Sequence, residues 1–208
     1  MDLMMKNMTL VDFAAMVASE SPVPGGGSMA AVCGALSAAL AEMVANLTIG
    51  KKKYIEAEPE MKEIAIKALA LRHKLLDDIQ RDSDSYDKVM VAYKMPKETE
   101  VEKDARQNAI QESLKLAASV PLDIAVTSFE ILPLTDLVVS KGNANAVTDG
   151  LVACMMARTA VLSALFNVKI NLDSIKDEDF VNEMRDKVND IELKTIKYEK
   201  KVLDKSPF

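Results

Sequence analysis

The sequence predicts an all-α fold, a helical bundle of about seven helices in which long helices pack antiparallel. Three observations lead to this class. Apolar residues recur at i+3 and i+4 spacing through long segments, no segment alternates as a strand would, and only 4% of the residues are aromatic. The chain of 208 residues is long enough for one sizeable core, so we expect a single domain, 1–208.

Capping and proline signals divide the first half of the chain into three helices. The first, at 9–19, begins with Thr9 and Asp12, which have the spacing of a capping box. Two prolines then require extended chain before an Ala-rich helix at 29–49. Pro59 opens a long helix that ends near residue 96. The apolar stripe of this long helix is Met61, Ile64, Ala68, Leu71, Leu75, Ile79, Asp82, Tyr86, Val89 and Tyr93.

Prolines also divide the next part of the chain. A helix is expected at 97–118, because Pro121 suits the first turn of the helix that follows. Pro133 should kink that following helix. The residues Lys141-Gly142-Asn143 then break it.

The last part of the chain holds a second Ala-rich stretch, 144–168, whose helix opens near Asn145 and stops near Asn167. Small residues spaced along both Ala-rich helices allow two backbones to approach closely, so a chain with few aromatic residues can still pack densely. Ser174 and Asp177 have the spacing of a cap for the final helix, which is striped from 180 to 202.

Composition and charge exclude several classes of protein. The formal net charge of -6 would repel a phosphate backbone, so we expect no nucleic-acid partner. Cys33 and Cys154 lie far apart in apolar stretches, as reduced thiols of a cytoplasmic protein do, and the N-terminus lacks an export signal. Both Ala-rich stretches are long enough to span a bilayer, but they carry charged residues such as Glu42 and Asp149, so we expect buried helices and no membrane partner.

The most unusual local feature is a loop with three consecutive glycines, Gly25, Gly26 and Gly27, followed by Ser28. A helix that starts directly after such a loop has open backbone N–H groups, which can bind an anion. The loop has neither the preceding strand of a dinucleotide-binding unit nor the Lys of a Walker loop. The alternative is a structural turn that Ser28 caps.

Asp82 is the second candidate, because it occupies the apolar stripe between Ile79 and Tyr86. A carboxylate among apolar neighbours has a pKa set by desolvation and by nearby charges, which is how a general acid or base is tuned. The alternative is a stripe that reaches solvent at this point. The surrounding aspartates lack the Gly and Glu of a calcium loop, and the lone His73 has no Cys or His partner, so we expect no metal.

Two further groups of polar residues flank the Ala-rich helices. Asn143, Asn145 and Asp149 lie at the start of the second one, where one Asn can cap the helix while the other faces a ligand. Three lysines follow the end of the first one, where they either form a solvated helix end or bind an anionic ligand; they are Lys51, Lys52 and Lys53.

Five sequence blocks together resemble the cyclodeaminase domain of formiminotransferase-cyclodeaminases, which stand-alone methenyltetrahydrofolate cyclohydrolases share. The blocks cover nearly the whole chain. They are SPVPGGGSMAA from Ser21, MVANLTIGKKKY from Met43, Asp82 with Tyr86 and AYKMPK from Ala92, GN with TD at Asp149, and NV with NL from Asn167. The transferase part of the bifunctional enzymes is absent from these 208 residues.

The resemblance implies a dimeric folate enzyme that acts at the one-carbon unit between N5 and N10 of tetrahydrofolate and needs no other cofactor. We expect a formiminotetrahydrofolate cyclodeaminase, with methenyltetrahydrofolate cyclohydrolase as the alternative and a non-catalytic helical adaptor as a third reading. Asp82 and Asp149 are the expected catalytic carboxylates. The expected substrate-binding residues are Gly25, Gly26, Gly27, Ser28, Tyr86, Asn143 and Asn145, with Lys51, Lys52 and Lys53 for the glutamate tail.

Overall fold

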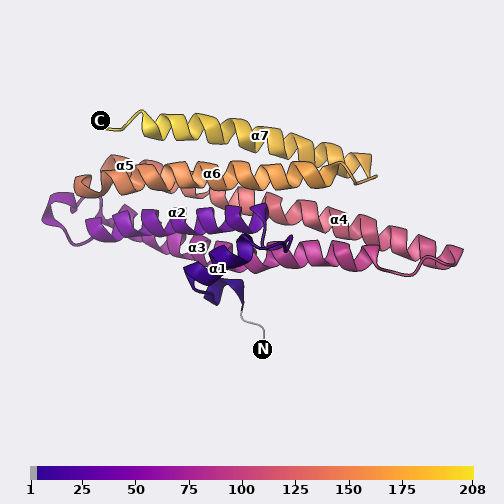
Figure 1. Ribbon diagram of the computed structural model, residues 1–208. Coiled ribbons are helices and arrows are strands. Elements are labelled where there is room, and N and C mark those ends of the chain that lie inside the picture. Colours follow the sequence, from indigo (N-terminus) through magenta and orange to yellow (C-terminus); the bar gives the residue numbers. More distant parts are fainter. Residues whose placement is uncertain (1–3) are drawn as a thin grey trace.

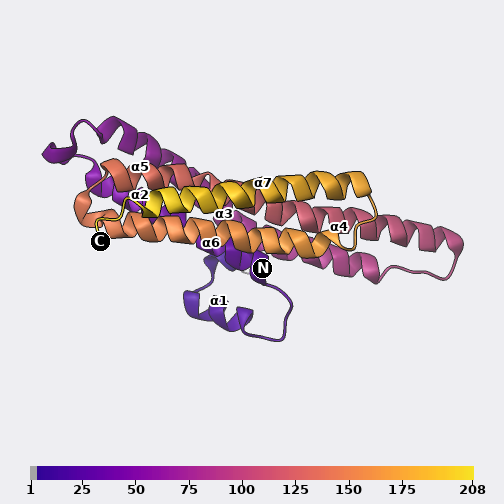
Figure 2. The same cartoon turned by 90° about the horizontal axis from the view of Figure 1, so that it is seen from above.

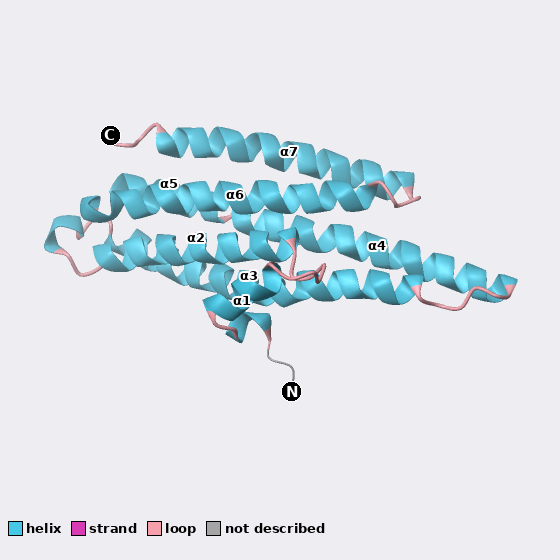
Figure 3. Ribbon diagram, in the orientation of Figure 1, coloured by secondary structure: helices cyan, strands magenta, loops and turns pink. Residues whose placement is uncertain are grey.

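A computed structural model describes residues 4–208, and these residues form an all-helical bundle (Figure 1). Figure 3 shows helices joined by loops, without a strand in this part of the chain, so the predicted class is confirmed. The α-helices are α1 (Leu10–Val17), α2 (Gly26–Thr48), α3 (Glu58–Tyr93), α4 (Glu100–Phe129), α5 (Ile131–Lys141), α6 (Val147–Leu172) and α7 (Glu178–Leu203). Three short 3-10 helices are η1 (Met5–Asn7), η2 (Lys52–Tyr54) and η3 (Ala144–Ala146).

The bundle is built around α2, which packs between α3 and α6. Helix α4 lies behind them and contacts both α3 and α6, while α7 packs along α6 (Figure 1). The α3–α4 pair extends past the other helices at one end, and α1 stands off the bundle (Figure 2).

Small residues let α2 and α6 approach each other closely, as predicted. Alanines at α2 positions 30, 31, 38, 41 and 45 and at α6 positions 153, 157, 160 and 164 are fully buried. The hydroxyl of Ser37 on α2 donates a hydrogen bond of 2.7 Å to the backbone oxygen of Ala153 on α6. Such direct contact between a side chain and the facing backbone requires a tight crossing of the two helices.

The predicted helix boundary at Pro121 is wrong, because α4 runs without interruption from Glu100 to Phe129 with Pro121 inside it. A proline lacks the N–H that would bond the carbonyl four residues earlier, so the oxygen of Ala117 loses its helical partner. The side-chain amide Nδ2 of Asn171 on α6 donates to that oxygen at 3.0 Å. This tertiary hydrogen bond satisfies the carbonyl, and sequence spacing alone could not show it.

Other predicted ends shift by a few residues. Helix α2 begins at Gly26, inside the glycine triplet, and Pro133 occupies the first turn of α5 instead of kinking a longer helix. Helix α6 continues past Asn167 to Leu172. Asp177, without Ser174, caps α7 by accepting from the backbone N–H of Phe180 at 3.1 Å. The Thr9 cap of α1 is confirmed.

Two segments are long and apolar enough to cross a membrane, Gly26–Thr48 with a mean hydropathy of 1.6 and Ala144–Leu172 with 1.7. Their most apolar windows are 56% and 50% buried within the bundle. The small residues of both segments face the core, so each helix has a buried side and an exposed side. The predicted free thiols are observed, with Cys154 buried and Cys33 half-buried.

At Gly34, helix α2 lies close to α3 and α4, and this contact yields a stability prediction. A Cβ at this position would lie 2.6 Å from Ser128 Oγ and 3.0 Å from a methyl carbon of Leu75. We expect Gly34→Ala to lower the free energy of unfolding by about 1–3 kcal/mol, because overpacking outweighs the gain in helix propensity. Urea unfolding followed by circular dichroism measures this.

Ser128→Ala provides the matched control. Ser128 Oγ is buried and has no hydrogen-bond partner among residues 4–208, so its removal should not destabilise the protein. In the Gly34→Ala background the same change should recover part of the lost stability, because it removes the nearest atom. A Gly34→Ala protein at least as stable as the parent would contradict the tight packing of α2.

Candidate functional site

A cavity of about 300 Å³ opens at the N-terminus of α2. It lies where the glycine loop, the middle of α3 and the C-terminal part of α6 meet. It is lined by Pro22, Val23, Gly25, Gly26, Gly27, Asp82, Ser85, Tyr86, Ala117, Asn167, Ile170 and Asn171. The structure therefore brings the predicted glycines together with Asp82 and Tyr86, which lie more than fifty residues further along the chain.

The glycines place the start of α2 directly against Asp82. Gly25 is the N-cap residue and provides no capping side chain. A Cβ on Gly27 would lie 2.1 Å from Asp82 Oδ1 and 2.6 Å from its Cγ, so only glycine allows the carboxylate to approach this helix end. The open N–H groups of the first turn and the helix dipole make this a favourable place for negative charge.

Asp82 is held by Ser28, which is fully buried. The Ser28 hydroxyl lies 2.9 Å from Asp82 Oδ2, to which it donates, and 3.2 Å from the Ser83 hydroxyl. Burial raises the pKa of the Asp82 carboxyl above its ordinary value, while the hydrogen bonds from the side chain and backbone of Ser28 oppose that rise. Ser28 therefore orients the carboxylate and does not act as the helix cap.

Two asparagines complete the cavity, and they were not among the predicted site residues. Asn167 Nδ2 donates to the oxygen of Ser163 at 2.9 Å, and Asn171 Nδ2 donates to the oxygens of Ala117 and Asn167. These bonds fix both amide groups, and neither Oδ1 accepts a hydrogen bond from any residue in 4–208. Asp82, Asn167 and Asn171 thus give the cavity side chains that can accept hydrogen bonds, and its lining includes no lysine or arginine. Two Asn spaced i, i+4 near the end of an apolar helix are the sequence signal that could have identified them.

The remaining predicted site residues lie at the opposite end of α2. Asn143 Nδ2 donates to the oxygen of Leu47 at 3.0 Å, and the N–H of Ala144 donates to the Tyr54 hydroxyl at 3.0 Å, so the 143–145 turn packs against the 51–54 turn. The 23 residues of α2 separate this end from the cavity by about 33 Å. Within one chain the predicted site residues therefore form two groups.

The second group has the following arrangement. Asn143 caps η3 by accepting from the backbone N–H of Asn145, and Asp149 lies in the first turn of α6. Lys51, Lys52 and Lys53 are exposed, and no carboxylate within residues 4–208 lies within 4.0 Å of their ammonium groups. The ammonium group of Lys53 lies 5.2 Å from the centre of the Tyr54 ring.

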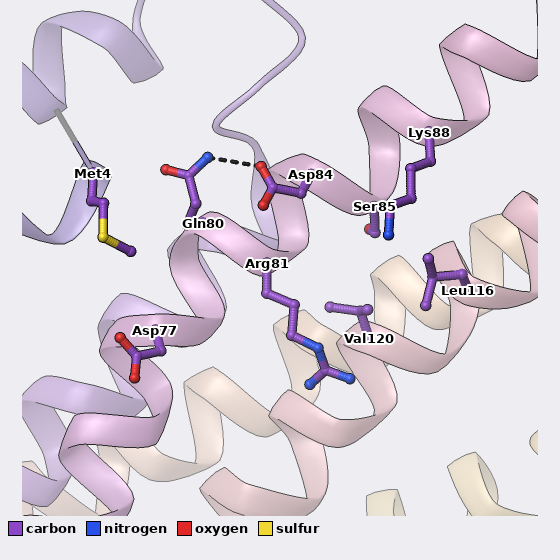
Figure 4. A pocket seen from close by; sticks show the side chains of 9 residues that line it. All are labelled: Met4, Asp77, Gln80, Arg81, Asp84, Ser85, Lys88, Leu116 and Val120. Atoms are coloured by element: carbon purple, nitrogen blue, oxygen red, sulfur yellow. Dashed lines mark hydrogen bonds between the residues drawn. The ribbon is translucent and has the colours of Figure 1, made fainter. Parts of the chain in front are cut away.

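A second cavity, of about 270 Å³, shares Ser85 with the first, and its lining side chains come from Met4, α3 and α4 (Figure 4). Its lining holds none of the predicted site residues. Arg81 is engaged by Asp123 at 2.7 Å and by Asp78 at 3.2 Å, and Gln80 donates to Asp84 at 2.8 Å. Because Arg81 is already paired with carboxylates outside the lining, and because the lining holds none of the predicted site residues, we place the site in the Asp82 cavity.

Comparison with known proteins identifies the relatives of the chain. The family model described as formiminotransferase-cyclodeaminase matches residues 9–190. A methenyltetrahydrofolate cyclohydrolase from Methylorubrum extorquens is 44% identical over 177 residues, which cover 85% of each chain. A formimidoyltransferase-cyclodeaminase from Rattus norvegicus is 34% identical over 86% of this chain, but the chain spans only 33% of that relative.

The solved structures include a similar fold. A crystal structure of a formiminotetrahydrofolate cyclodeaminase from Thermotoga maritima superposes with a TM-score of 0.87 at 34% sequence identity. The match covers 96% of both chains.

The contact between Ser28 and Asp82 yields a prediction for the pKa of the carboxyl. We expect Ser28→Ala to raise the pKa of Asp82 further, because the hydroxyl stabilises the ionised form. A pH titration of the carboxyl carbon shift by NMR measures it. Ser21→Ala is the control, since the Ser21 hydroxyl donates to the oxygen of Val23 and leaves Asp82 untouched. An unchanged or lowered pKa in Ser28→Ala would show that the hydroxyl does not stabilise the carboxylate.

Proposed function

This chain belongs to the formiminotransferase-cyclodeaminase family, and we propose that it acts on the one-carbon unit between N5 and N10 of tetrahydrofolate. The observation that carries this proposal is the half-buried Asp82 carboxylate, held by Ser28 against the start of α2 at the wall of a cavity. A carboxylate with a raised pKa can both accept and return a proton. Because the family consists of enzymes, its match to this chain argues against the alternative of a non-catalytic helical adaptor.

The specific reaction we propose is that of a methenyltetrahydrofolate cyclohydrolase. The motif blocks alone favoured the cyclodeaminase. The 44% identity to a cyclohydrolase over 85% of both chains, against 34% to the cyclodeaminases, now favours the hydrolytic reaction. We retain the cyclodeaminase as a second candidate, because a cyclodeaminase with this fold matches over 96% of both chains.

In the hydrolytic reaction a water molecule attacks the methenyl carbon, and the Asp82 carboxylate takes one of its protons. This forms a C–O bond and a neutral tetrahedral carbon that carries a hydroxyl group. The protonated Asp82 then gives its proton to N5 as the C–N5 bond breaks, and the hydroxyl proton leaves to solvent. The product is 10-formyltetrahydrofolate, with one proton released overall.

In the second candidate reaction N10 attacks the carbon of a protonated formimino group on N5. Asp82 accepts the proton from N10 and delivers it to the amino group, which leaves as ammonia as the C–N bond breaks. The product is the 5,10-methenyl cation. Both reactions place a positive charge on the same carbon, which an ionised Asp82 would stabilise.

The other parts of the site have proposed roles in binding. Tyr86 and the glycine loop would position the ligand in the cavity, and the oxygens of Asn167 and Asn171 would accept hydrogen bonds from its N–H groups. We propose no cofactor beyond tetrahydrofolate, a cytoplasmic location and assembly as a homodimer. Exposed apolar side chains on α2 and α6 support the assembly.

The experiment that tests the function is incubation of the purified protein with 5,10-methenyltetrahydrofolate and, separately, with 5-formiminotetrahydrofolate. The absorbance of the methenyl chromophore is followed in both. Loss of the chromophore faster than in buffer supports the cyclohydrolase. Its appearance together with ammonia supports the cyclodeaminase, and no change in either would exclude both.

Asp82→Asn tests the proton-transfer role. We expect turnover to fall at least ~100-fold, because the amide cannot accept the proton, while the circular dichroism spectrum stays that of the parent. Asp84→Asn is the matched control on the same helix, since Asp84 accepts from Gln80 outside the cavity. Near-normal turnover in Asp82→Asn would remove Asp82 from the mechanism.

The raised pKa of Asp82 predicts the shape of the pH profile. Since Asp82 must be ionised to accept a proton, kcat/KM should fall as the pH falls through the pKa of Asp82. Because burial raises this pKa, the acidic limb should lie above the value of about 3.9 that an ordinary Asp would give. A limb at or below that value, measured with controls for protein unfolding, would contradict the role.

A further inference from the structure

Behind the Asp82 carboxylate, two serine hydroxyls form a chain of contacts that leads away from the cavity. Ser28 Oγ lies 2.9 Å from Asp82 Oδ2 and 3.2 Å from Ser83 Oγ. Ser83 Oγ in turn lies 3.5 Å from Met5 Sδ, in the N-terminal 3-10 helix η1. Ser83 is not part of the cavity lining. The proton transfer proposed for Asp82 therefore does not involve Ser83 directly.

The Ser28 hydroxyl has one proton and three acceptors within reach. The acceptors are Asp82 Oδ2, the Ser83 hydroxyl oxygen and, at 3.1 Å, the backbone oxygen of Ile79. Because a serine hydroxyl carries a single proton, donation to Ser83 or Ile79 would leave the carboxylate without this donor. The direction of the hydrogen bond between Ser28 and Ser83 therefore decides whether Ser28 stabilises the Asp82 carboxylate.

Ser83 also has one proton, and its two acceptors differ in strength. It can donate to Ser28 Oγ or to Met5 Sδ, and a thioether sulfur is a weak acceptor. If Ser83 donates to Ser28, the Ser28 proton goes to the carboxylate, and the two hydrogen bonds polarise each other. If Ser83 donates to Met5, Ser28 can donate to Ser83 instead, and the carboxylate loses a charge-assisted hydrogen bond. The first arrangement uses the strongest acceptor.

Water does not compete for either hydroxyl, because both are buried. Ser28 is fully buried and Ser83 is 1% exposed. A hydrogen bond lost in such surroundings is not replaced by one to solvent. The direction in which Ser83 donates is therefore transmitted to Asp82.

Contacts on either side of the Met5 side chain keep its sulfur beside Ser83. The backbone N–H of Met5 donates to Gln80 Oε1 at 3.3 Å, and the ammonium group of Lys6 pairs with Asp77. Both partners lie on α3, within two turns of Ser83. Helix η1 therefore provides a weak acceptor that competes for the Ser83 proton.

We propose that Ser83 is a positioning residue for Asp82: it donates its proton to Ser28, so that Ser28 donates to the carboxylate, and Met5 is the competing acceptor. Ser83 lies outside the cavity, so its effect passes through Ser28. The inference rests on the proposed function where it concerns turnover, whereas the hydrogen bonds themselves belong to the folded chain. The surroundings that control Asp82 thus extend from the cavity to the N-terminal segment.

The charged groups on the surrounding elements are separate from this chain of hydrogen bonds. On α3, Asp78 raises the pKa of Asp82 by opposing its ionisation. Of the other residues that line the cavity, Tyr86 titrates and none is charged, and Glu20 in the loop before α2 is exposed. Charged side chains of the elements around α3 form pairs of their own: Glu42 of α2 with Arg72, Asp123 of α4 with Arg81, Lys6 of η1 with Asp77, and Lys169 of α6 with Glu192. Substitution of Ser83 or Met5 leaves these charges in place.

Two substitutions should move the pKa of Asp82 in opposite directions, measured by NMR titration of the carboxyl carbon shift. Ser83→Ala removes the hydroxyl that polarises Ser28, so the Ser28 hydrogen bond weakens and the pKa of Asp82 should rise. Met5→Leu keeps the side-chain volume but removes the competing acceptor, so the pKa should fall. Ser119→Ala is the matched control and should leave the pKa unchanged, since the Ser119 hydroxyl donates to the Lys115 oxygen within α4.

The pH dependence of kcat/KM tests the same chain of hydrogen bonds in turnover. On the acidic limb, kcat/KM follows the ionised fraction of Asp82, so Ser83→Ala should retain a roughly threefold smaller share of its plateau value than the parent does. Ser83→Thr keeps the hydroxyl and should restore the parent limb. Circular dichroism at each pH verifies that all variants stay folded.

The outcomes separate the proposal from its alternatives. A lowered pKa in Ser83→Ala would show that Ser28 donates to Ser83 in the parent and would overturn the proposed direction. An unchanged pKa in Ser83→Ala, or a folded Ser83→Thr that behaves like Ser83→Ala, would leave Ser83 with a structural role only. A pKa that does not fall in Met5→Leu would exclude Met5 as the competing acceptor. Shifts of the expected sign in proteins that turn over neither folate would support the positioning by Ser83 and overturn the proposed function.

Discussion

The close approach of α2 to α3 and α6 is the constraint on which the site depends. Side chains at the contact are small, and at Gly34 and Gly27 even a Cβ would clash with the neighbouring helix. At Gly27 the missing Cβ admits the Asp82 carboxylate to the first turn of α2, where Ser28 holds it. The small Ala and Gly side chains therefore allow both the dense packing of a chain with few aromatic residues and the contact between the α2 backbone and the Asp82 carboxylate.

Much of this arrangement could be predicted from the sequence because it follows from local patterns. The i+3/i+4 stripe of α3 carries Asp82 toward the core side of the helix, and the glycine triplet marks the start of α2. A carboxylate in an apolar stripe and a loop without side chains are unusual enough to be noticed separately. Their contact is part of the tertiary structure. The carboxylate needs hydrogen-bond donors and the start of the helix needs an acceptor, so each satisfies the other.

The parts that could not be predicted depend on contacts between distant segments. A proline normally ends a helix, and nothing in the neighbourhood of Pro121 shows that Asn171 bonds the carbonyl it leaves open. The lysine triplet at 51–53 is close in sequence to the helix that begins with the glycine loop, yet a helix of 23 residues carries the two apart. Residues at the two ends of a long helix are close in sequence but far apart in space. The glycine loop and the lysine triplet of one chain therefore lie too far apart to form a single site.

Asn171 has a consequence for how the family can vary. Its amide nitrogen bonds the Ala117 carbonyl, and this bond also fixes the direction of its oxygen at the cavity. In a homologue with a residue other than proline at position 121, the backbone N–H would restore the helical hydrogen bond to the Ala117 oxygen. Asn171 would then no longer be needed to satisfy that oxygen. A lineage that kept Pro121 would retain an amide at 171 even where ligand preference drifted. Positions 121 and 171 should therefore change together during evolution, which ties the integrity of one helix to the polarity of the site.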